Sequence, residues 1–103
     1  MSVEFAPKEY RKYELDWDEA RLYCFSLRID GKVGWRLPTA LELMDDMAVE
    51  LMYDTDQSNW FWTAECSTDR AEQVDLYDFE TMSFDKTNRS SVWVCPVRDL
   101  KDD

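Results

Sequence analysis

The stretch Gly34-Trp35-Arg36-Leu37-Pro38-Thr39, followed by Glu42 and Leu43, decides the fold of this chain. Pro38 has a fixed φ angle and no backbone N–H, and it holds the residue before it in extended geometry. A helix is therefore expected to begin just after it. Thr39 and Glu42 have the spacing of a capping box, in which each side chain binds the backbone N–H of the other residue.

The residues after this motif predict one buried face of a helix of roughly three to four turns. The apolar positions of that face are Leu43, Met44, Met47, Ala48 and Leu51. Asp45, Asp46 and Glu50 fall between them and are expected to face solvent.

The segment before the motif predicts a strand followed by another helix. Tyr13 and Leu15 alternate with charged residues, which is typical of a half-buried strand. Asp16 and Glu19 then have the spacing of an acidic capping box. The apolar stripe that follows consists of Trp17, Ala20, Cys24 and Leu27, and it ends before Asp30.

The second half of the chain predicts several strands in succession. The segments are Trp60-Phe61-Trp62-Thr63, then Val74 with Leu76 and Phe79, then a short Met82-Ser83-Phe84, and last Val92-Trp93-Val94-Cys95-Pro96-Val97. Pro96 favours an edge or a bulge for the last one. This order predicts an α+β fold, with two helices packed on a mainly antiparallel sheet and residues 1–103 as one domain.

Composition limits the classes of partner. Acidic residues outnumber basic ones 23 to 12, and the net charge of −11 repels nucleic-acid phosphates and anionic lipid. We therefore expect no direct nucleic-acid binding. The chain shows neither a run of ~18 apolar residues nor a charged segment leading into an apolar one, so the expectation is no membrane contact and no secretion signal. A protein in the cytoplasm or carried on a virion fits this pattern.

Several motifs together resemble the DUF1566 family, also called the Lcl C-terminal domain. They are Trp17-Asp18-Glu19-Ala20 with Cys24 and Leu27, the motif of residues 34–39 with Glu42-Leu43, Trp62-Thr63, and Val94-Cys95-Pro96-Val97-Arg98. The resemblance implies a C-type-lectin-like fold. It also implies a binding module of the kind found in adhesins and in secreted or phage-borne proteins, with no catalytic residues attached to the motif.

Within the motif, Trp35 is expected to be buried and the guanidinium of Arg36 to contact the carboxylate of Glu42 at two points. The other interpretation is that Glu42 only caps the helix, while Arg36 is solvated. The structural motif as a whole consists of Trp35, Arg36, Pro38, Thr39 and Glu42. In both interpretations, these residues serve structure and not chemistry.

The three cysteines are Cys24, Cys66 and Cys95. The resemblance implies a second cysteine at the place of Pro96. A shift of one residue along a strand points the side chain to the opposite face. Three free thiols are therefore expected. The alternative is a bridge between Cys24 and Cys95, which requires that the helix and the terminal strand meet. Cys66 has acidic neighbours in sequence and is expected to be a small, semi-buried side chain.

The chain contains no histidine, which excludes Ser-His and Cys-His nucleophile pairs and histidine-based zinc sites. Asp54, Asp56, Ser58 and Glu65 imitate a calcium loop, but Asn59 stands where the sharp turn requires glycine. An Asx-rich turn is the alternative interpretation. We expect no metal, no cofactor and no catalytic residues.

The leading interpretation is a non-catalytic module that binds a protein or carbohydrate partner, either phage-encoded or a subunit of a larger assembly. Its predicted binding residues, all between positions 77 and 89, are Tyr77, Phe79, Phe84 and Arg89. The alternative for these aromatics is a place in the core. A second class of function is an acidic inhibitor that mimics nucleic acid, using Asp45, Asp46, Glu50, Asp54 and Asp56. An enzyme is the third class.

Overall fold

The computed structural model describes residues 3–46 and 60–100, and of residues 45 and 46 it describes the backbone alone. The elements in chain order are β1 (Val3–Phe5), the 3-10 helix η1 (Lys8–Tyr10), β2 (Lys12–Tyr13), α1 (Trp17–Ser26), α2 (Ala40–Asp46), β3 (Trp60–Cys66), β4 (Arg70–Asp75), β5 (Glu80–Asp85), β6 (Trp93–Val94) and β7 (Val97–Asp99). Within these described ranges the fold is α+β with two α-helices, as the sequence predicts.

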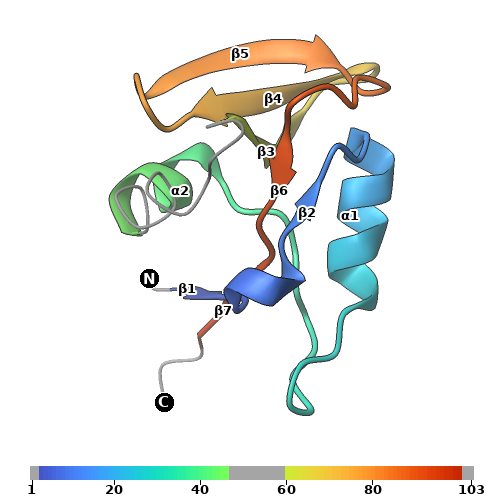
Figure 1. The fold of residues 1–103 in the computed structure, drawn as a ribbon, viewed down its shortest axis with the longest axis vertical. Coiled ribbons are helices and arrows are strands. Elements are labelled where there is room, and N and C mark those ends of the chain that lie inside the picture. Colours follow the sequence, from blue (N-terminus) through green and yellow to red (C-terminus); the bar gives the residue numbers. More distant parts are fainter. Residues whose placement is uncertain (1–2, 47–59, 101–103) are drawn as a thin grey trace.

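The strands form two sheets in the described part of the chain. The larger has the order β2-β6-β3-β4-β5 and is antiparallel except between β3 and β6, where Phe61 lies opposite Trp93 in a parallel pair. The smaller joins the first and last described strands, with Val3 opposite Asp99. Figure 1 shows the larger sheet between the two helices, with β4 and β5 at the end of the molecule away from β1 and β7.

Helix α1 begins as the sequence predicts. The Asp16 carboxylate accepts from the Glu19 N–H at 2.8 Å, and the Glu19 carboxylate accepts from the Asp16 N–H at 3.0 Å, which completes the capping box. Trp17, Ala20 and Cys24 are buried, as one apolar stripe requires. The backbone becomes extended at Leu27, where the helix has ended.

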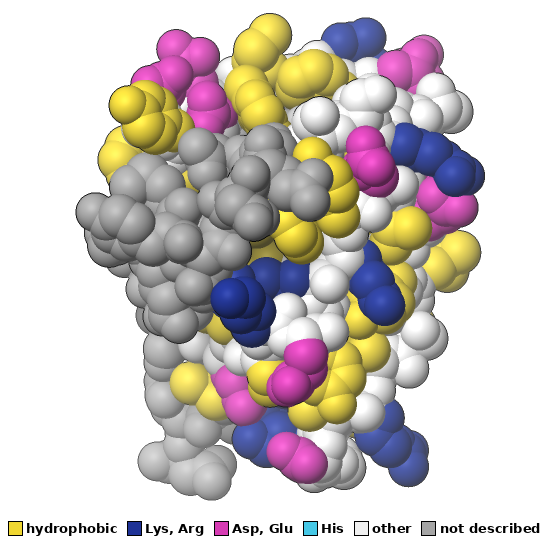
Figure 2. All heavy atoms as spheres, viewed as in Figure 1, with side chains coloured by type: hydrophobic (Ala, Val, Ile, Leu, Met, Phe, Trp, Pro, Cys, Tyr) yellow, Lys and Arg dark blue, Asp and Glu magenta, His cyan; other side chains and the backbone are white. Residues whose placement is uncertain are grey.

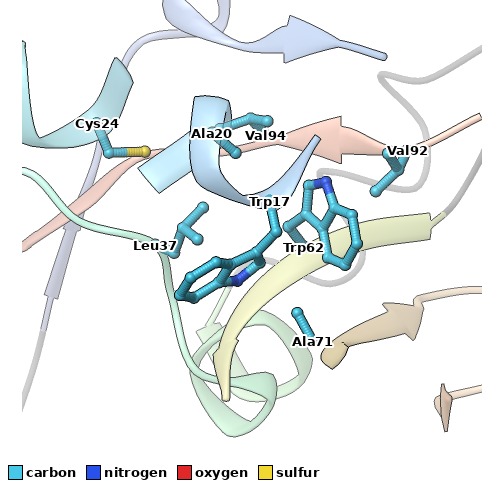
Figure 3. Close-up of a cluster of buried hydrophobic side chains, with 8 residues drawn as sticks. All are labelled: Trp17, Ala20, Cys24, Leu37, Trp62, Ala71, Val92 and Val94. Atoms are coloured by element: carbon cyan, nitrogen blue, oxygen red, sulfur yellow. The ribbon is translucent and has the colours of Figure 1, made fainter. Parts of the chain in front are cut away.

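The two faces of the larger sheet pack against different helices because neighbouring residues of β3 point to opposite sides. Trp62 packs with Trp17 and Ala20 of α1 (Figure 3), and each indole N–H donates to a backbone carbonyl, Trp17 to Thr63 and Trp62 to Leu15, both at 2.9 Å. Phe61 points the other way and packs with Leu43 of α2.

The residues of the Gly34–Thr39 motif lie where the two sheets meet. Trp35 is buried with Ala6 and Ile29 in a cluster of its own. Arg36 exchanges two backbone hydrogen bonds with Val97, at 2.7 and 2.8 Å, so the motif is tied to the last described strand. Gly34, directly before the buried Trp35, has a φ of +88°, a conformation that residues with a side chain rarely adopt.

Three strand predictions are wrong in detail. The segment around Tyr13 and Leu15 makes only a two-residue strand, because Glu14 has a left-handed φ of 65° and stops the ladder. Phe79, at φ 58°, lies in a turn and not in a strand.

The segment Val92–Val97 is also not one edge strand. It is divided at Cys95 and Pro96, and its first part, β6, lies inside the larger sheet between β2 and β3. The break follows from the missing N–H of Pro96, whose carbonyl accepts from Ala6 N–H at 2.9 Å. None of the helices in residues 3–46 and 60–100 has the length and apolar character needed to cross a membrane.

Candidate functional site

The hairpin formed by β4 and β5 carries the exposed aromatic side chains that the sequence singles out. Tyr77 is 69% exposed and Phe79 is 54% exposed, and both lie in the turn between the two strands. Met82 of β5 is 50% exposed. Figure 2 shows hydrophobic and acidic side chains side by side at the upper end of the molecule, where Figure 1 places β4 and β5.

The local sequence accounts for the shape of this turn. The Asp75 carboxylate accepts from the Tyr77 N–H at 2.9 Å. Aspartate side chains at turns commonly accept from the backbone N–H two residues further along the chain. Phe79 has a φ of 58°, which is unusual for a bulky residue and costs roughly 1 kcal/mol or more. Phe79 is thus a strained residue whose side chain is largely exposed, so its packing within the chain offsets little of the strain.

Phe84 belongs to the core side of the hairpin. It is half-buried, packs against the cluster around Trp17 and Trp62, and meets the Trp60 ring edge-on at a centroid distance of 5.6 Å. Met82 shares this face of β5 because the two residues are two positions apart, yet it is exposed. Phe84 therefore supports the hairpin and presents little surface to a partner.

Arg89 lies at the opposite end of β5 from Tyr77 and Phe79. Its guanidinium contacts the Glu19 carboxylate at 2.8 Å and the Asp16 carboxylate at 3.8 Å. These are the two residues of the α1 capping box, so Arg89 anchors the segment after β5 to the start of α1. The four predicted binding residues consequently do not form one cluster: Tyr77 and Phe79 are together, and Phe84 and Arg89 are not with them.

Negative charge is concentrated at the turn end of the hairpin. Asp75, Asp78 and Glu80 lie there, within six residues of chain. The other end carries Asp85, whose pKa is lowered by hydrogen bonds from the Thr87 N–H and hydroxyl, and it also carries cations, Arg70 and Lys86. The exposed aromatics therefore lie in a region of negative charge.

The motif residues form a structural joint. The Arg36 guanidinium donates to the two carboxylate oxygens of Glu42 at 2.9 and 2.8 Å, to Asp99 at 2.6 Å and to the Leu37 carbonyl at 3.0 Å. Hydrogen bonding to Arg36 lowers the pKa of Glu42, while partial burial acts in the opposite direction. The two-point pair that the sequence predicts is thereby confirmed.

The rest of the motif supports this joint. Thr39 and Glu42 complete the second capping box, with the Thr39 N–H donating to Glu42 at 2.8 Å and the Glu42 N–H to the Thr39 hydroxyl at 3.2 Å. Pro38 is buried, and its carbonyl accepts from the Ala64 N–H at 2.8 Å, which ties the motif to β3. With Trp35 in the core, the hydrogen bonds of these residues hold the start of α2 to the sheets.

Cys66 differs from its prediction, because it is exposed and not semi-buried. The pairing of β3 with β4 shifts register between Trp62 and Cys66, which removes the end of the strand from the regular alternation of faces. Cys66 lines a shallow hollow of about 220 Å³ with Arg70 and Ser83.

Cys24 and Cys95 are both buried, and all three cysteines are present as thiols. Burial raises the pKa of Cys24 to about 12, and Cys95 adds to the same shift.

A second exposed apolar surface lies on the outer face of α1, and the sequence analysis missed it. Phe25 is 81% exposed and Leu22 is 60% exposed, and with Leu15 they line a groove of about 740 Å³. Their three-residue spacing, outside the buried stripe, is the signal that could have revealed this surface.

Several predicted residues cannot be placed. Glu50, Asp54 and Asp56 of the acidic-mimic interpretation lie outside the described residues, as do the side chains of Asp45 and Asp46 and Ser58 of the calcium-loop segment. In the ranges that are described, no three His, Cys, Asp or Glu side chains are grouped so that they could hold a metal ion.

No family model matches the chain, and a search of the curated proteins finds no match either.

Proposed function

We propose that this chain is a non-catalytic binding module that holds a protein partner on the β4–β5 hairpin. The observation that carries the proposal is the exposure of Tyr77, Phe79 and Met82 on one hairpin. Aromatic residues and methionine are enriched at protein interfaces, and aromatic anchors often dominate their binding energy. A strained, exposed Phe79 is more easily understood if a partner covers it.

The proposed fold is C-type-lectin-like, of the DUF1566 kind. The order of strand, helix, helix and further strands supports it, as does the place of residues 34–39 at the junction of the two sheets. A chain without histidine also lacks the side chain most often used as a general base near neutral pH. These observations support recognition rather than catalysis.

The hairpin is preferred over the α1 groove for a specific reason. Around Phe25 and Leu22 the surface offers apolar side chains on a helix whose backbone groups bond within the helix. The hairpin combines exposed aromatics with carboxylates and with the edge of a sheet. It can therefore supply apolar contact, charge and backbone hydrogen bonds together.

The proposal is tested by partner capture with two matched double variants. The immobilised chain is exposed to extract of its native host, and captured proteins are identified by mass spectrometry. We expect Tyr77→Ser/Phe79→Ser to lose the captured protein and Leu22→Ser/Phe25→Ser to retain it. Both variants change exposed side chains, so melting temperatures close to the wild type are the control for folding.

Other outcomes point elsewhere. Retention by the hairpin variant together with loss by the α1 variant would overturn the proposed surface. Binding to a glycan array that depends on Tyr77 and Phe79 would replace the protein partner by a carbohydrate. Capture that is insensitive to both variants and falls steeply with salt would favour the acidic-mimic interpretation.

A further inference from the structure

Strand β5 is the outermost strand of the larger sheet. Its residues pair with β4 on one side, and no described strand pairs with them on the other. All of its side chains are exposed except the half-buried Phe84. Protein sheets often protect such an edge with proline or with lysine. The segment Glu80-Thr81-Met82-Ser83-Phe84-Asp85 contains neither.

The hydrogen-bond pattern shows which backbone groups face outward. Lys86 N–H donates to the Asp69 carbonyl, in register with the β4–β5 pairing. Hydrogen-bonded pairs alternate along an antiparallel ladder, so Phe84 and Met82 also bond toward β4. Thr81 and Ser83 consequently direct their backbone groups away from the sheet.

Part of this edge is already occupied by the chain itself. The Arg70 guanidinium donates to the Ser83 carbonyl at 2.6 Å and to the Ser83 hydroxyl at 2.9 Å. The Asp85 carbonyl accepts from the Asn88 N–H at 2.9 Å. The Thr81 N–H and carbonyl and the Ser83 N–H then remain for an added strand, and they lie next to the exposed Met82.

The charges around β5 indicate which kind of segment fits beside it. Asp75, Asp78 and Glu80 make the turn end of β5 negative, whereas Arg70 and Lys86 offset Asp85 at the other end. A second copy of this chain would bring another net charge of −11 to the same place. A basic segment would bring opposite charge.

Resting on the proposed function, we propose that the hairpin binds an extended, basic segment of a partner protein as an additional strand beside β5. Main-chain hydrogen bonds to Thr81 and Ser83 provide the affinity of this mode, and side chains provide the specificity. Lysine or arginine of the segment lies near Glu80 and Asp78, and apolar side chains contact Met82.

The test uses a defined probe, the capped peptide Lys-Lys-Val-Thr-Val-Thr-Lys-Lys, and the full chain labelled with nitrogen-15. Strand addition predicts that the amide signals of Thr81 and Ser83 shift most during titration and that their hydrogen exchange slows. Signals of α1, including Phe25, are expected to stay in place.

Two N-methylated forms of the peptide separate strand addition from attraction by charge. One form is methylated at alternate amides, and the other at the remaining amides. Only the amides that face β5 matter in strand addition, so one form loses affinity at least about tenfold and the other binds as the parent does. Equal affinities for all three forms, or absence of binding by the parent peptide, would overturn the proposal.

Two further measurements complete the test. Asp78→Lys/Glu80→Lys is expected to weaken parent-peptide binding roughly fivefold or more. Glu9→Lys/Asp30→Lys, which makes the same charge change at exposed positions in η1 and in the turn after α1, is the matched control. Equal weakening by both variants would contradict a local role of the hairpin charges. Self-association of the chain that protects Thr81 and Ser83 would make a second copy the occupant and overturn the proposal. If either of these two results is obtained, partner capture that depends on Tyr77 and Phe79 would still support the proposed function.

Discussion

Arg36 and Glu42 form a two-point ion pair, with nitrogen-to-oxygen distances of 2.9 and 2.8 Å. The side chains are 33% and 21% exposed, so the pair is partly removed from water. The same guanidinium reaches Asp99 beside the smaller sheet. One side chain thus links the start of α2 to the last described strand.

Replacing Arg36 by alanine is expected to destabilise the fold by about 1–3 kcal/mol, because Glu42 and the Leu37 carbonyl lose charged hydrogen bonds. Arg36→Lys keeps the charge but loses the two-point contact, and we expect an intermediate loss. Urea denaturation measures both. Arg28→Ala, at an exposed position, is the control, with a change within about 0.5 kcal/mol. A urea midpoint of Arg36→Ala equal to that of the wild type would show that the Arg36 contacts do not stabilise the fold.

The same pair predicts that the free energy of unfolding decreases at acid pH. Hydrogen bonding to Arg36 depresses the pKa of Glu42 below its ordinary 4.5 in the folded state. Its stabilisation is therefore fully present above that value and is lost as the pH falls through the folded-state pKa. Glu42→Gln is expected to lower stability at pH 7 and to flatten the loss of stability as the pH falls below 4.5. If the stability of Glu42→Gln falls with pH as steeply as that of the wild type, another group causes the loss of stability in acid.

The cysteines are expected to differ in reactivity. Cys66 is exposed and reacts with a thiol reagent in the native protein, whereas Cys24 and Cys95 are buried and react only after unfolding. Burial raises the pKa of Cys24 to about 12, which further suppresses its thiolate. Intact mass before and after denaturation, without reductant, is expected to show one and then three modifications. Only one modification after denaturation would reveal a disulfide, and Cys66→Ser identifies the fast thiol.

The buried amide of Gln73 is expected to lower the stability of the fold relative to an apolar side chain of the same size. It is 1% exposed, and its side-chain amide nitrogen has no hydrogen-bond partner. Replacing it with methionine removes the unmet donor at similar size, and we expect a gain of about 1 kcal/mol. Thr63 is the contrast, because its buried hydroxyl donates to the Glu72 carbonyl at 3.0 Å. Thr63→Val is expected to destabilise. A loss of stability in Gln73→Met would show that the amide has a role of its own.

The features that the sequence predicts well are local. Both capping boxes and the Arg36–Glu42 pair join residues three to six positions apart, so their geometry depends mainly on the helix that they start. The buried stripe of α1 follows from helical spacing for the same reason.

The features that could not be predicted depend on distant parts of the chain. The place of β6 between β2 and β3 requires pairings over more than thirty residues. Arg89 reaches Glu19 across 70 positions, so no local pattern shows that it contacts the start of α1. Met82 and Phe84 share one face of β5, and only the position of the Trp17 cluster makes Phe84 the half-buried one.

The central claim is that a partner binds the β4–β5 hairpin, and hydrogen–deuterium exchange on the complex tests it most directly. The captured partner is bound to the unmodified chain, and backbone exchange is followed peptide by peptide. The account predicts slowed exchange over residues 76–85, around Tyr77, Phe79 and Thr81, with α1 unchanged. Slowed exchange over Trp17–Ser26, with the hairpin exchanging as it does in the free chain, would contradict it.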